Sequence, residues 1–408
     1  MTTLLVYMNG IHIGLLSTKN GELSFVYIDQ PTAGLAHQLP IQKEVFSHEQ
    51  CEPFFSGLLP DEPVRSNLAR LLKVSPRNTF GLLQHLGGDC AGAIQVLPRH
   101  SDSDEDPSLR TLSDAELFSI LQNLPQRPLG IGIEGFRISG AGAQDKLVLS
   151  KREGQWCLPL HGHPSTHMIK PNIHGFADSV LNEYFCMLLA GRVGIRVPPV
   201  EIITLQGHQF YAVERYDREY VDNEILRLHQ EDFCQLLNIP PHQKYQNEGG
   251  PSIPMMFEVV QTFQRQGRMK GSETIHLLNL VLFNFLIGNG DAHGKNFSIL
   301  YKGAQIELAP GYDLLSTLVY GNFYTEKMAM KIGSKYKFKA VAKRHFDDMA
   351  YAIGISSKLV KRQSAKLVSV VSQEAQILLR EMSEQGLTSV VLDEINAVIQ
   401  NQCQLFAH

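Results

Sequence analysis

At residues 288–296 the chain reads Gly-Asn-Gly-Asp-Ala-His-Gly-Lys-Asn, and Tyr312-Asp313 follows it. Within this stretch Asp291 precedes Asn296 by five residues, and Asp313 comes about twenty residues after the first Asp. A tight loop lets Asp291 reach an attacking hydroxyl while Asn296 turns toward a Mg²⁺ ion, and Asp313 can bind the metal from the next strand. The spacing therefore predicts a phosphoryl-transfer site of the kind found in kinase-like folds.

The composition is that of an ordinary globular protein, with 43% hydrophobic and 19% charged residues among 408. This length is sufficient for a large hydrophobic core and two or three domains. The formal net charge is −4. The chain as a whole is therefore not a polyanion binder, and any contact with nucleic acid must be local.

The cysteines and the apolar segments favour a cytoplasmic protein. The six cysteines are scattered without a Cys-x-x-Cys pair, which argues against a zinc site or a disulfide framework and suits a reducing compartment. The N-terminus lacks the basic-then-apolar pattern of a secretory signal. The most apolar run, Leu277 to Ile287, is too short to span a bilayer and predicts a buried helix. We therefore expect no membrane partner.

The first hundred residues predict a small β-rich unit with short helices. Asn9-Gly10 is a strong two-residue hairpin signal between apolar runs, and Asn20-Gly21 marks a second turn. One helix is expected after Pro63 and another over Thr79–Leu86. The acidic, turn-rich stretch 100–107 predicts an exposed linker near a subdomain boundary.

Farther along, the pattern changes from mixed to helical. From about residue 130 to 220, strands, Gly-rich turns and a helix alternate, and from about 225 onward helical periodicity dominates. A mixed small lobe followed by a helical large lobe is the order of a bilobal kinase. We therefore predict an α+β, bilobal kinase-like fold with an all-helical C-terminal lobe. The expected parts are a β-rich subdomain (1–100), the remainder of the small lobe (101–220) and the large lobe (221–408).

A second element, at residues 139–146, contains small residues that let backbone N–H groups approach a polyphosphate. It is not a Walker A motif, because Lys146 is not followed by Ser or Thr, and an ordinary hairpin loop is the alternative. The segment 130–135 spells Gly-x-Gly-x-x-Gly, but Pro125 and Pro128 precede it instead of a clean strand, so the match has little weight. The residues of the loop expected to bind ATP are Ser139, Gly140, Ala141, Gly142, Ala143, Gln144 and Lys146.

Two strand ends complete the predicted nucleotide site. His167–Lys170 is a short strand that ends in a lysine, which kinases use to pair with the α- and β-phosphates. A second strand, 211–213, leads into Glu214 and Tyr216, where kinase backbone groups bond the adenine edge. The alternatives are a solvated lysine and a solvated turn. The order of these elements along the chain favours the nucleotide site.

Two further features have open roles. His293 either contacts phosphate or orders the loop around it. The basic stretch 327–344 has few acidic residues and includes aromatic ones. It either meets nucleic-acid phosphates or forms a solvated loop and helix face. The lysines considered as possible DNA contacts are Lys331, Lys335, Lys337 and Lys339.

Taken in this order, the motifs resemble the HipA family, which are the toxin kinases of HipBA toxin–antitoxin modules. The likeness covers nearly the whole chain, because the β-rich N-terminal unit also resembles the first subdomain of that family. The stretches that carry it are Ser139–Lys146, His167–Lys170, Ala212–Asp217, Gly288–Asn296 and Tyr312-Asp313.

The resemblance implies a serine/threonine protein kinase of phosphatidylinositol-kinase-like fold that uses ATP and Mg²⁺. Its catalytic residues would be Asp291, His293, Asn296 and Asp313, of which the last two would bind the metal. The implied target is an aminoacyl-tRNA synthetase, glutamyl-tRNA synthetase in the best-known members. Phosphorylation of that target lowers translation and causes growth arrest and persistence.

The resemblance also implies self-regulation and partners. Autophosphorylation would fall on Ser139, where a phosphate carrying nearly two negative charges would repel the phosphates of ATP. The implied partner is a dimeric helix-turn-helix antitoxin similar to HipB. Through it the chain would bind operator DNA and act as a corepressor.

Two other functions stay open on the residues alone. An aminoglycoside-type small-molecule phosphotransferase shares a Gly-Asp-x-His-x-x-Asn loop, but it would not explain Ser139 or the N-terminal unit. A non-catalytic corepressor subunit is the second alternative, and the intact catalytic positions argue against it. The distinguishing observations are whether phosphate transfer requires Asp291 and whether the phosphate reaches a protein or a small molecule.

Overall fold

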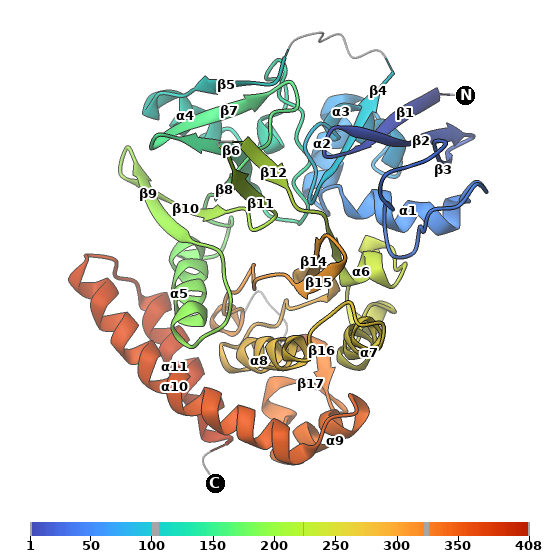
Figure 1. Ribbon diagram of the computed structural model, residues 1–408. Coiled ribbons are helices and arrows are strands. Elements are labelled where there is room, and N and C mark those ends of the chain that lie inside the picture. Colours follow the sequence, from blue (N-terminus) through green and yellow to red (C-terminus); the bar gives the residue numbers. More distant parts are fainter. Residues whose placement is uncertain (1, 100–105, 223, 322–325, 407–408) are drawn as a thin grey trace. The chain divides into compact units, whose positions relative to one another are not determined.

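In the computed structural model, the chain folds into two compact units. Figure 1 shows their helices and strands. The structure describes residues 2–99, 106–222, 224–321 and 326–406, so residues 100–105 of the predicted acidic linker lie outside the described residues. The segment 172–202, expected within the small lobe, belongs to the second unit. The first unit comprises Met1–Pro171 and Ile203–His242, and the second comprises Asn172–Ile202 and Gln243–His408.

The first unit begins with an antiparallel sheet of strand order β3-β2-β1-β4 (Figure 1). Asn9 and Gly10, with φ angles of 49° and 77°, join the first two strands, and Asn20 and Gly21 join the next two in the same way. Both predicted hairpins are confirmed, because Asn and Gly adopt the left-handed conformation at low cost. The strands are β1 (Thr2–Met8), β2 (Ile11–Lys19), β3 (Glu22–Tyr27) and β4 (Ile94–Pro98).

Three helices share a core with this sheet. Alternate strand residues such as Leu4, Val6 and Phe25 are almost completely buried, together with Phe55 of the first helix. This alternation follows from the two-residue period of a strand, which turns every second side chain to the same face. Both helices predicted in this part are confirmed. The helices are α1 (His48–Gly57), α2 (Val64–Leu72) and α3 (Thr79–Leu86).

A second sheet, of order β5-β7-β6-β8-β10-β9, carries two of the predicted nucleotide elements. Its strand β6 is buried at Leu147, Val148 and Leu149. The predicted strands ending at Lys170 and spanning 211–213 are confirmed as β8 and β10. The elements are β5 (Ser108–Thr111), α4 (Asp114–Gln122), β6 (Leu147–Arg152), β7 (Gln155–Leu160), β8 (His167–Lys170), β9 (Val200–Leu205) and β10 (His208–Glu214).

Short elements complete the first unit after β10. The strands β11 and β12 form an antiparallel hairpin. The helix α6 begins with a capping box, in which Asp232 and Gln235 each bond the backbone N–H of the other. These elements are β11 (Arg218–Val221), β12 (Glu224–Arg227), β13 (Gln230–Asp232) and α6 (Phe233–Leu236).

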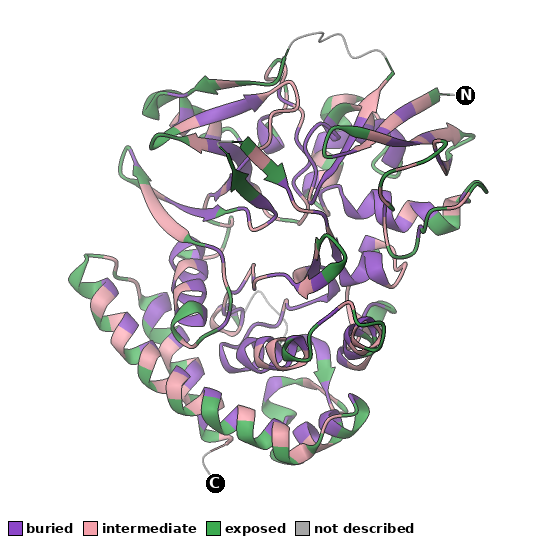
Figure 2. Cartoon of the chain, in the orientation of Figure 1, coloured by how far each residue is buried: buried purple, intermediate pink, exposed green. Residues whose placement is uncertain are grey.

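The second unit is built around the helix α8 (Figure 2). Nearly all of its residues from Leu277 to Leu286 are buried, on every side of the helix. The buried helix predicted at this position is confirmed. The helices α7, α10 and α11 pack against it, and α5 packs against α10 and α11. The helices are α5 (Ser179–Arg192), α7 (Ile253–Arg265), α8 (Ser272–Leu286), α9 (Lys343–Ala352), α10 (Ser357–Glu384) and α11 (Val390–Gln404).

The prediction that residues 221–408 are all-helical is wrong. Besides the strands that end the first unit, this range contains two hairpins in the second unit. Gly303 and Gly333 have positive φ angles of 61° and 57° at the turns of these hairpins. The strands are only three to six residues long, too short for a clear two-residue hydrophobic period. They are β14 (Ser298–Lys302), β15 (Gln305–Leu308), β16 (Lys327–Ile332) and β17 (Lys335–Lys337).

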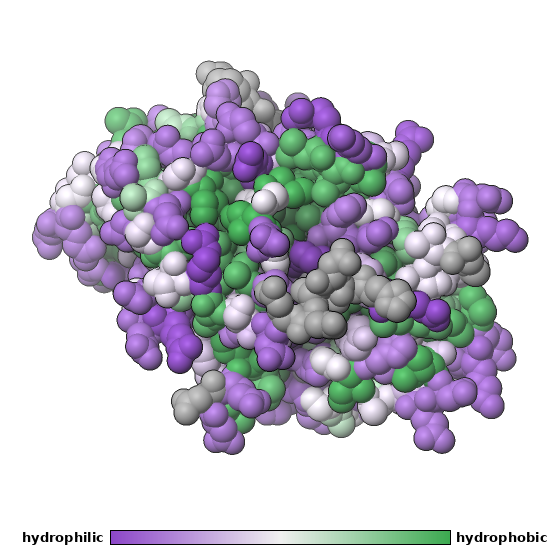
Figure 3. Space-filling model, turned by 90° about the horizontal axis from the view of Figure 1, so that it is seen from above, coloured by the Kyte–Doolittle hydropathy of each residue, from purple (hydrophilic) through white to green (hydrophobic). Residues whose placement is uncertain are grey.

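The surface is mixed in character. Figure 3 shows hydrophilic residues over most of one face, with apolar residues gathered in patches between them. Leu71 of α2 is one of the large apolar side chains that reach the surface, with 38% of it exposed. Among the helices of the described residues, none has both the length and the apolar character needed to cross a bilayer.

Candidate active site

The loop after α8 is fixed to the segment around Thr317. Gly288 has a φ angle of +71°, and a Cβ atom there would lie 2.8 Å from Val398 Cγ1, so the position requires glycine. The N–H of Gly290 donates to Thr317 Oγ1 at 2.7 Å, and the N–H of Thr317 donates to the carbonyl of Gly288 at 3.1 Å. The loop therefore starts from a rigid base at the end of a buried helix.

Asp291 lies at the centre of a local hydrogen-bond pattern. Its N–H donates to Asn289 Oδ1 at 3.0 Å, and its backbone carbonyl accepts from Asn296 Nδ2 at 2.9 Å. The same carbonyl accepts from the N–H of His293 at 2.8 Å. Its side-chain Oδ1 accepts from the hydroxyl of Tyr245 at 2.5 Å. These bonds hold both the backbone and the carboxylate of Asp291, which is half-buried.

The predicted Asp-x₄-Asn spacing therefore folds into one closed loop, with Asn296 in a 3₁₀ turn (Gly294–Asn296). The side-chain nitrogen of Asn296 is used inside the loop, and its Oδ1 oxygen is the atom able to bind a cation. Gly294 is required for this closure, because a Cβ atom there would lie 2.4 Å from Pro251 Cγ.

Asp313 is joined to this loop by a contact that the sequence did not indicate. Asn289 Nδ2 donates to Asn284 Oδ1 at 2.7 Å and to the backbone carbonyl of Asp313 at 3.4 Å. Asp313 has a φ angle of 51°, an uncommon conformation for a residue with a side chain. The hydroxyl of Tyr312 donates to the carbonyl of Lys295 at 2.7 Å. The two predicted motifs thus meet through bonds from Asn289 and Tyr312.

His293 is buried, and its ring makes an edge contact with Tyr245 at a centroid distance of 5.2 Å. Because Tyr245 also donates to Asp291, this packing links His293 to the orientation of the carboxylate. Of the two roles left open by the sequence, ordering of the loop is the one for which the structure provides a contact.

Asn296 in the loop and Asp313 beyond it carry side-chain oxygens of the kind that Mg²⁺ binds. Within the described residues, no group of three or more His, Cys, Asp or Glu side chains is able to hold a metal ion. Mg²⁺ is commonly bound by one or two carboxylates together with phosphates of the substrate. The Oδ1 of Asn296 and the carboxylate of Asp313 fit a metal ion that binds together with a nucleotide.

The predicted Gly-rich loop is anchored at both ends in the first unit. Ser139 is buried, its Oγ donates to the carbonyl of Leu58, and its N–H donates to the carbonyl of Asp89 at 3.1 Å. The N–H of Asp61 donates to the carbonyl of Gly142 at 3.1 Å. Gly142 has a φ angle of +100°, which a side chain would strain. The loop is therefore held in one conformation by the N-terminal part.

Two buried lysines lie at the same end of the neighbouring middle strands β6 and β8 of the second sheet. The register of β6 and β8 pairs Leu147 with Ile169, so the preceding Lys146 and the following Lys170 come side by side. Lys146 Nζ donates to the carbonyl of Gln144 at 2.8 Å. Lys170 Nζ lies 5.7 Å from the ring centroid of Tyr211.

The predicted hinge residues lie at the end of β10 and just beyond it. Glu214 is exposed at the end of this strand, and the Tyr216 hydroxyl donates to Gln230 Oε1 at 2.5 Å. The alternative of a fully solvated Glu-Arg-Tyr-Asp turn is wrong for two of its members. Arg215 and Asp217 are buried, at 8% and 3% exposure.

These two residues belong to a buried ionic network that sequence reasoning missed, here called the Asp89 cluster (Asp89, Arg215, Asp217, Arg218 and Arg227). Asp89 Oδ1 lies 2.9 Å from Arg227 Nε and 3.0 Å from Arg218 Nη2, and its Oδ2 lies 3.3 Å from Arg215 Nη1. Asp217 Oδ2 lies 2.8 Å from Arg215 Nη2 and 3.0 Å from Arg218 Nη1. The partners are far apart in sequence, so no local spacing could indicate them.

The charges of the Asp89 cluster fix its protonation. Burial alone would raise the pKa of Asp89, but the three guanidinium groups hold it well below its ordinary value. Burial, followed by the charge of Arg215, lowers the pKa of Arg218 to about 10. The cluster thus sets three guanidinium groups against two carboxylates in the interior. Removal of one carboxylate would leave an unbalanced positive charge in the interior.

A buried histidine beside this cluster predicts acid sensitivity. Burial lowers the pKa of His229 to about 4, although a backbone hydrogen bond to Leu35 and the charge of Asp217 raise it. In the unfolded chain the value is about 6.5. The folded state, in which His229 is neutral, therefore keeps its full stability above pH 6.5. As the pH falls from there toward 4, the free energy of unfolding should decrease by roughly 3 kcal/mol, because the unfolded chain binds a proton at this histidine first.

This loss is measurable by urea unfolding between pH 7.5 and 4.5. His229→Gln should flatten the pH dependence of the free energy of unfolding, whereas His208→Gln, at an exposed position, should leave it as in the wild type. Equal slopes for wild type and His229→Gln would contradict the assignment.

Part of the basic stretch 327–344 is not available for contacts with nucleic acid. Phe338 and Phe346 are buried and pack on Phe285, at ring-centroid distances of 5.7 and 5.3 Å, so they are not available to nucleic-acid bases. Lys339 Nζ pairs with Glu326 Oε2 at 2.6 Å. The lysines considered as DNA contacts lie on β16, on β17 and in the turn that follows, exposed or half-exposed: Lys331, Lys335, Lys337 and Lys339.

Comparison with known proteins gives concordant matches over both parts of the chain. Residues 4–97 match the HipA N-terminal domain, and residues 138–376 match the HipA-like C-terminal domain. The chain is 38% identical to the putative kinase Y4mE of Sinorhizobium fredii, over 98% of this chain and 97% of that protein. It is 29% identical to the serine/threonine-protein kinase toxin HipA of Shewanella oneidensis, over 88% of this chain and 83% of that protein.

The fold of the chain also matches that of a solved structure. The fold matches a chain in the Shewanella oneidensis complex of HipA, HipB and operator DNA with a TM-score of 0.84 and 24% identity, over 98% of this chain and 96% of that chain. The mixed α/β architecture described above, with its several sheets and its helices, is therefore a known one.

Proposed function

Because the chain belongs to the HipA family of serine/threonine kinase toxins, we propose that it transfers the γ-phosphate of ATP to a serine or threonine of a protein, with Mg²⁺ as cofactor. We propose further that it is the toxin of a type II toxin–antitoxin pair. In this proposal the fold is of the bilobal, phosphatidylinositol-kinase-like type. The main observation that supports this proposal is the closed loop 288–296, whose hydrogen bonds orient Asp291 and Asn296 and hold the backbone of Asp313.

In the second unit, the proposed chemistry is positioning and charge neutralisation. The carboxylate of Asp291, held by Tyr245, would orient the acceptor hydroxyl and accept its proton. Asn296 Oδ1 and the carboxylate of Asp313 would bind Mg²⁺, which neutralises charge on the transferring phosphoryl group. His293 would keep the loop in order through its contact with Tyr245.

In the first unit, the proposed role is nucleotide binding. Lys146 and Lys170, side by side at one end of the strand pair β6–β8, would pair with the phosphates of ATP. The backbone at Glu214 and Tyr216 would bond the adenine. The small residues of the loop would let backbone N–H groups approach the phosphates: Ser139, Gly140, Ala141, Gly142, Ala143 and Gln144.

The proposed protein substrate is an aminoacyl-tRNA synthetase, with glutamyl-tRNA synthetase the first candidate. The test is incubation with Mg²⁺-ATP and a panel of purified synthetases, followed by phosphopeptide mapping and a charging assay. We expect one synthetase to gain a phosphoserine and to lose aminoacylation in proportion. Absence of phosphate on every synthetase, with ATP turnover intact, would contradict this target class and leave the kinase assignment standing.

Self-inactivation is proposed at Ser139. The buried hydroxyl, which donates to the carbonyl of Leu58, has no room to carry a phosphate where it lies. Phosphorylation of Ser139 would therefore require the loop to leave its anchors at Asp89 and Asp61, and a dianionic phosphate would oppose its return to an ATP-binding conformation.

We also propose a HipB-like helix-turn-helix antitoxin as partner and operator DNA as the ligand of the resulting complex. Support comes from the fold match to a chain of a HipA, HipB and operator DNA complex. The exposed lysines of β16 and β17 are the proposed phosphate contacts, and such contacts would make binding dependent on salt.

A further inference from the structure

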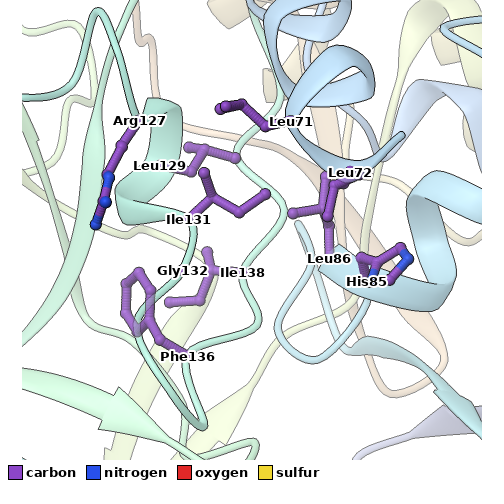
Figure 4. Close-up of a pocket in the computed structure, with 10 residues that line it drawn as sticks. All are labelled: Leu71, Leu72, His85, Leu86, Arg127, Leu129, Ile131, Gly132, Phe136 and Ile138. Atoms are coloured by element: carbon purple, nitrogen blue, oxygen red, sulfur yellow. The ribbon is translucent and has the colours of Figure 1, made fainter. Parts of the chain in front are cut away.

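A cavity of about 470 Å³ lies in the first unit, between α2 and α3 on one side and residues 127–138 on the other (Figure 4). This volume is within the range of small-molecule sites in proteins, roughly 300–1,000 Å³. The walls are mostly apolar. Leu71, Leu72 and Leu86 extend from the two helices, and Leu129, Ile131 and Phe136 face them from the opposite wall.

The opposite wall is formed by the Gly-x-Gly-x-x-Gly segment that has no role in the proposed phosphoryl transfer. Gly130 and Gly132 have φ angles of +71° and +96° and allow the chain to turn sharply there. Leu129 also has a positive φ angle of 56°, an uncommon and strained conformation for a leucine. This strained turn presents the Leu129 and Ile131 side chains to the cavity (Figure 4). Strain of this kind is typical of ligand sites.

The cavity has one cationic group among its lining residues, the solvent-exposed Arg127, which lies at its rim. Arg127 lines it, and Arg127 Nη1 lies 3.9 Å from where a Cβ atom of Gly132 would be. In the part of the chain that the structure describes, the Arg127 side chain has neither a hydrogen-bond partner nor an ion-pair partner. His85 lines the cavity as well, and burial, with the charge of Arg137, lowers its pKa, so it is neutral at pH 7. The cavity thus offers an apolar space and a single positive charge.

We propose that this cavity binds a small amphipathic carboxylate, with its hydrocarbon part between the leucine walls and its carboxylate on Arg127. A guanidinium group matches a carboxylate in shape and charge, and a single cation suits a monoanion. None of the residues that line the cavity belongs to a strand. A peptide therefore finds no strand edge to extend, whereas a small molecule needs only the apolar walls and the cation.

The cavity lies directly behind the Gly-rich loop. Ile138 lines it and is followed by the buried Ser139, and Leu129 Cδ2 lies 2.8 Å from where a Cβ atom of Gly140 would be. A ligand packed on Leu129 and Ile138 would favour the loop conformation in which Ser139 is buried, because it binds that conformation better than a displaced one. The ligand would thereby raise ATP affinity. This consequence rests on the proposed kinase function, whereas the binding itself does not.

The first experiment is calorimetric titration of the full chain, without nucleotide, with octanoate and with 1-octanol as a neutral probe of equal chain length. We expect one octanoate per chain and roughly tenfold weaker binding of octanol, the effect of one charge-assisted hydrogen bond. Arg127→Gln should weaken octanoate to the affinity of octanol and leave octanol unchanged. Arg77→Gln, an exposed arginine outside the cavity, is the matched control and should bind as the wild type does.

Leu71→Trp fills the cavity from its exposed rim and should abolish binding of both probes while leaving the thermal unfolding temperature near that of the wild type. Equal affinities for octanoate and octanol, unchanged octanoate binding in Arg127→Gln, or binding that survives Leu71→Trp would each overturn the proposal. Absence of a binding heat when octanoate is titrated into the wild type would also overturn the proposal.

A second experiment tests the coupling to the loop. ATP affinity is measured with and without saturating octanoate, and it should rise in the wild type and stay constant in Arg127→Gln. If the chain bound no ATP at all, the kinase proposal would fail while the calorimetric result stood. If ATP bound equally with and without octanoate, the coupling would be overturned and the carboxylate site would remain.

Discussion

Asp291→Asn is expected to lower phosphoryl transfer to protein by about 10²- to 10⁴-fold, the usual contribution of a positioned acid–base group. The amide has nearly the same shape as the carboxylate and can still accept from Tyr245, so the loop should keep its structure. It cannot accept the proton of the acceptor hydroxyl. Steady-state kinetics should therefore show a lower kcat with the KM for ATP nearly unchanged.

The control for this variant is Asp348→Asn, which changes an exposed aspartate of the same unit, on α9, and should leave both constants at their wild-type values. A loss of kcat of less than threefold in Asp291→Asn would contradict the role of this carboxylate. An increase in the KM for ATP without a loss of kcat would mean that Asp291 binds nucleotide and takes no part in proton transfer.

Asp89→Ala is expected to lower the free energy of unfolding by about 3–5 kcal/mol, which is typical for a buried ion pair that loses one partner. The Asp89 carboxylate contacts Arg215, Arg218 and Arg227, and it also accepts from the N–H and the hydroxyl of Ser165. Without it, three guanidinium groups would face a single carboxylate in the interior. Urea unfolding at pH 7 measures the change.

Two further variants separate charge from packing. Asp89→Asn keeps the shape and some of the hydrogen bonds and should lose less stability than Asp89→Ala. Asp29→Ala, at an exposed aspartate of the same unit, should change stability by less than about 0.5 kcal/mol. A loss below about 1 kcal/mol in Asp89→Ala would mean that the cluster is not a determinant of stability.

We expect the Asp89 cluster to affect nucleotide binding as well as stability. The backbone of Asp89 donates to the carbonyl of Arg137 at 3.0 Å and accepts from the N–H of Ser139 at 3.1 Å. Its carboxylate is bound by Arg215, which directly follows the predicted hinge residue Glu214. One residue thus joins the predicted adenine and phosphate elements. Asp89→Asn should therefore raise the KM for ATP more than it lowers kcat.

Local signals in the sequence were sufficient for much of the fold. Asn9-Gly10 specifies its hairpin because few other residue pairs adopt two consecutive left-handed conformations. The run Leu277–Leu286 specifies a buried helix because its apolar residues exceed one face. By contrast, the hairpins β14–β15 and β16–β17 are short, and neighbours distant in sequence, more than their own pattern, decide that they are strands.

The candidate site likewise combines features that are local in sequence with contacts between distant segments. The Asp291-to-Asn296 spacing is local and predicted a closed loop that the structure contains. The hydroxyl of Tyr245 on Asp291 and the bond from Asn289 to Asp313 join residues from separate segments, and no spacing rule reports such contacts. The Asp89 cluster could have been suspected only from the charged residues that follow β10, and nothing near Asp89 identifies it as their partner.

Intact mass and phosphopeptide mapping of the wild type and of Asp291→Asn, after incubation with Mg²⁺-ATP, show whether phosphoryl transfer depends on Asp291. We expect one phosphate on the Ser139 peptide of the wild type and none on the variant, with ATP binding lost in the modified fraction. Equal phosphorylation of both proteins would show that Asp291 is not the catalytic residue.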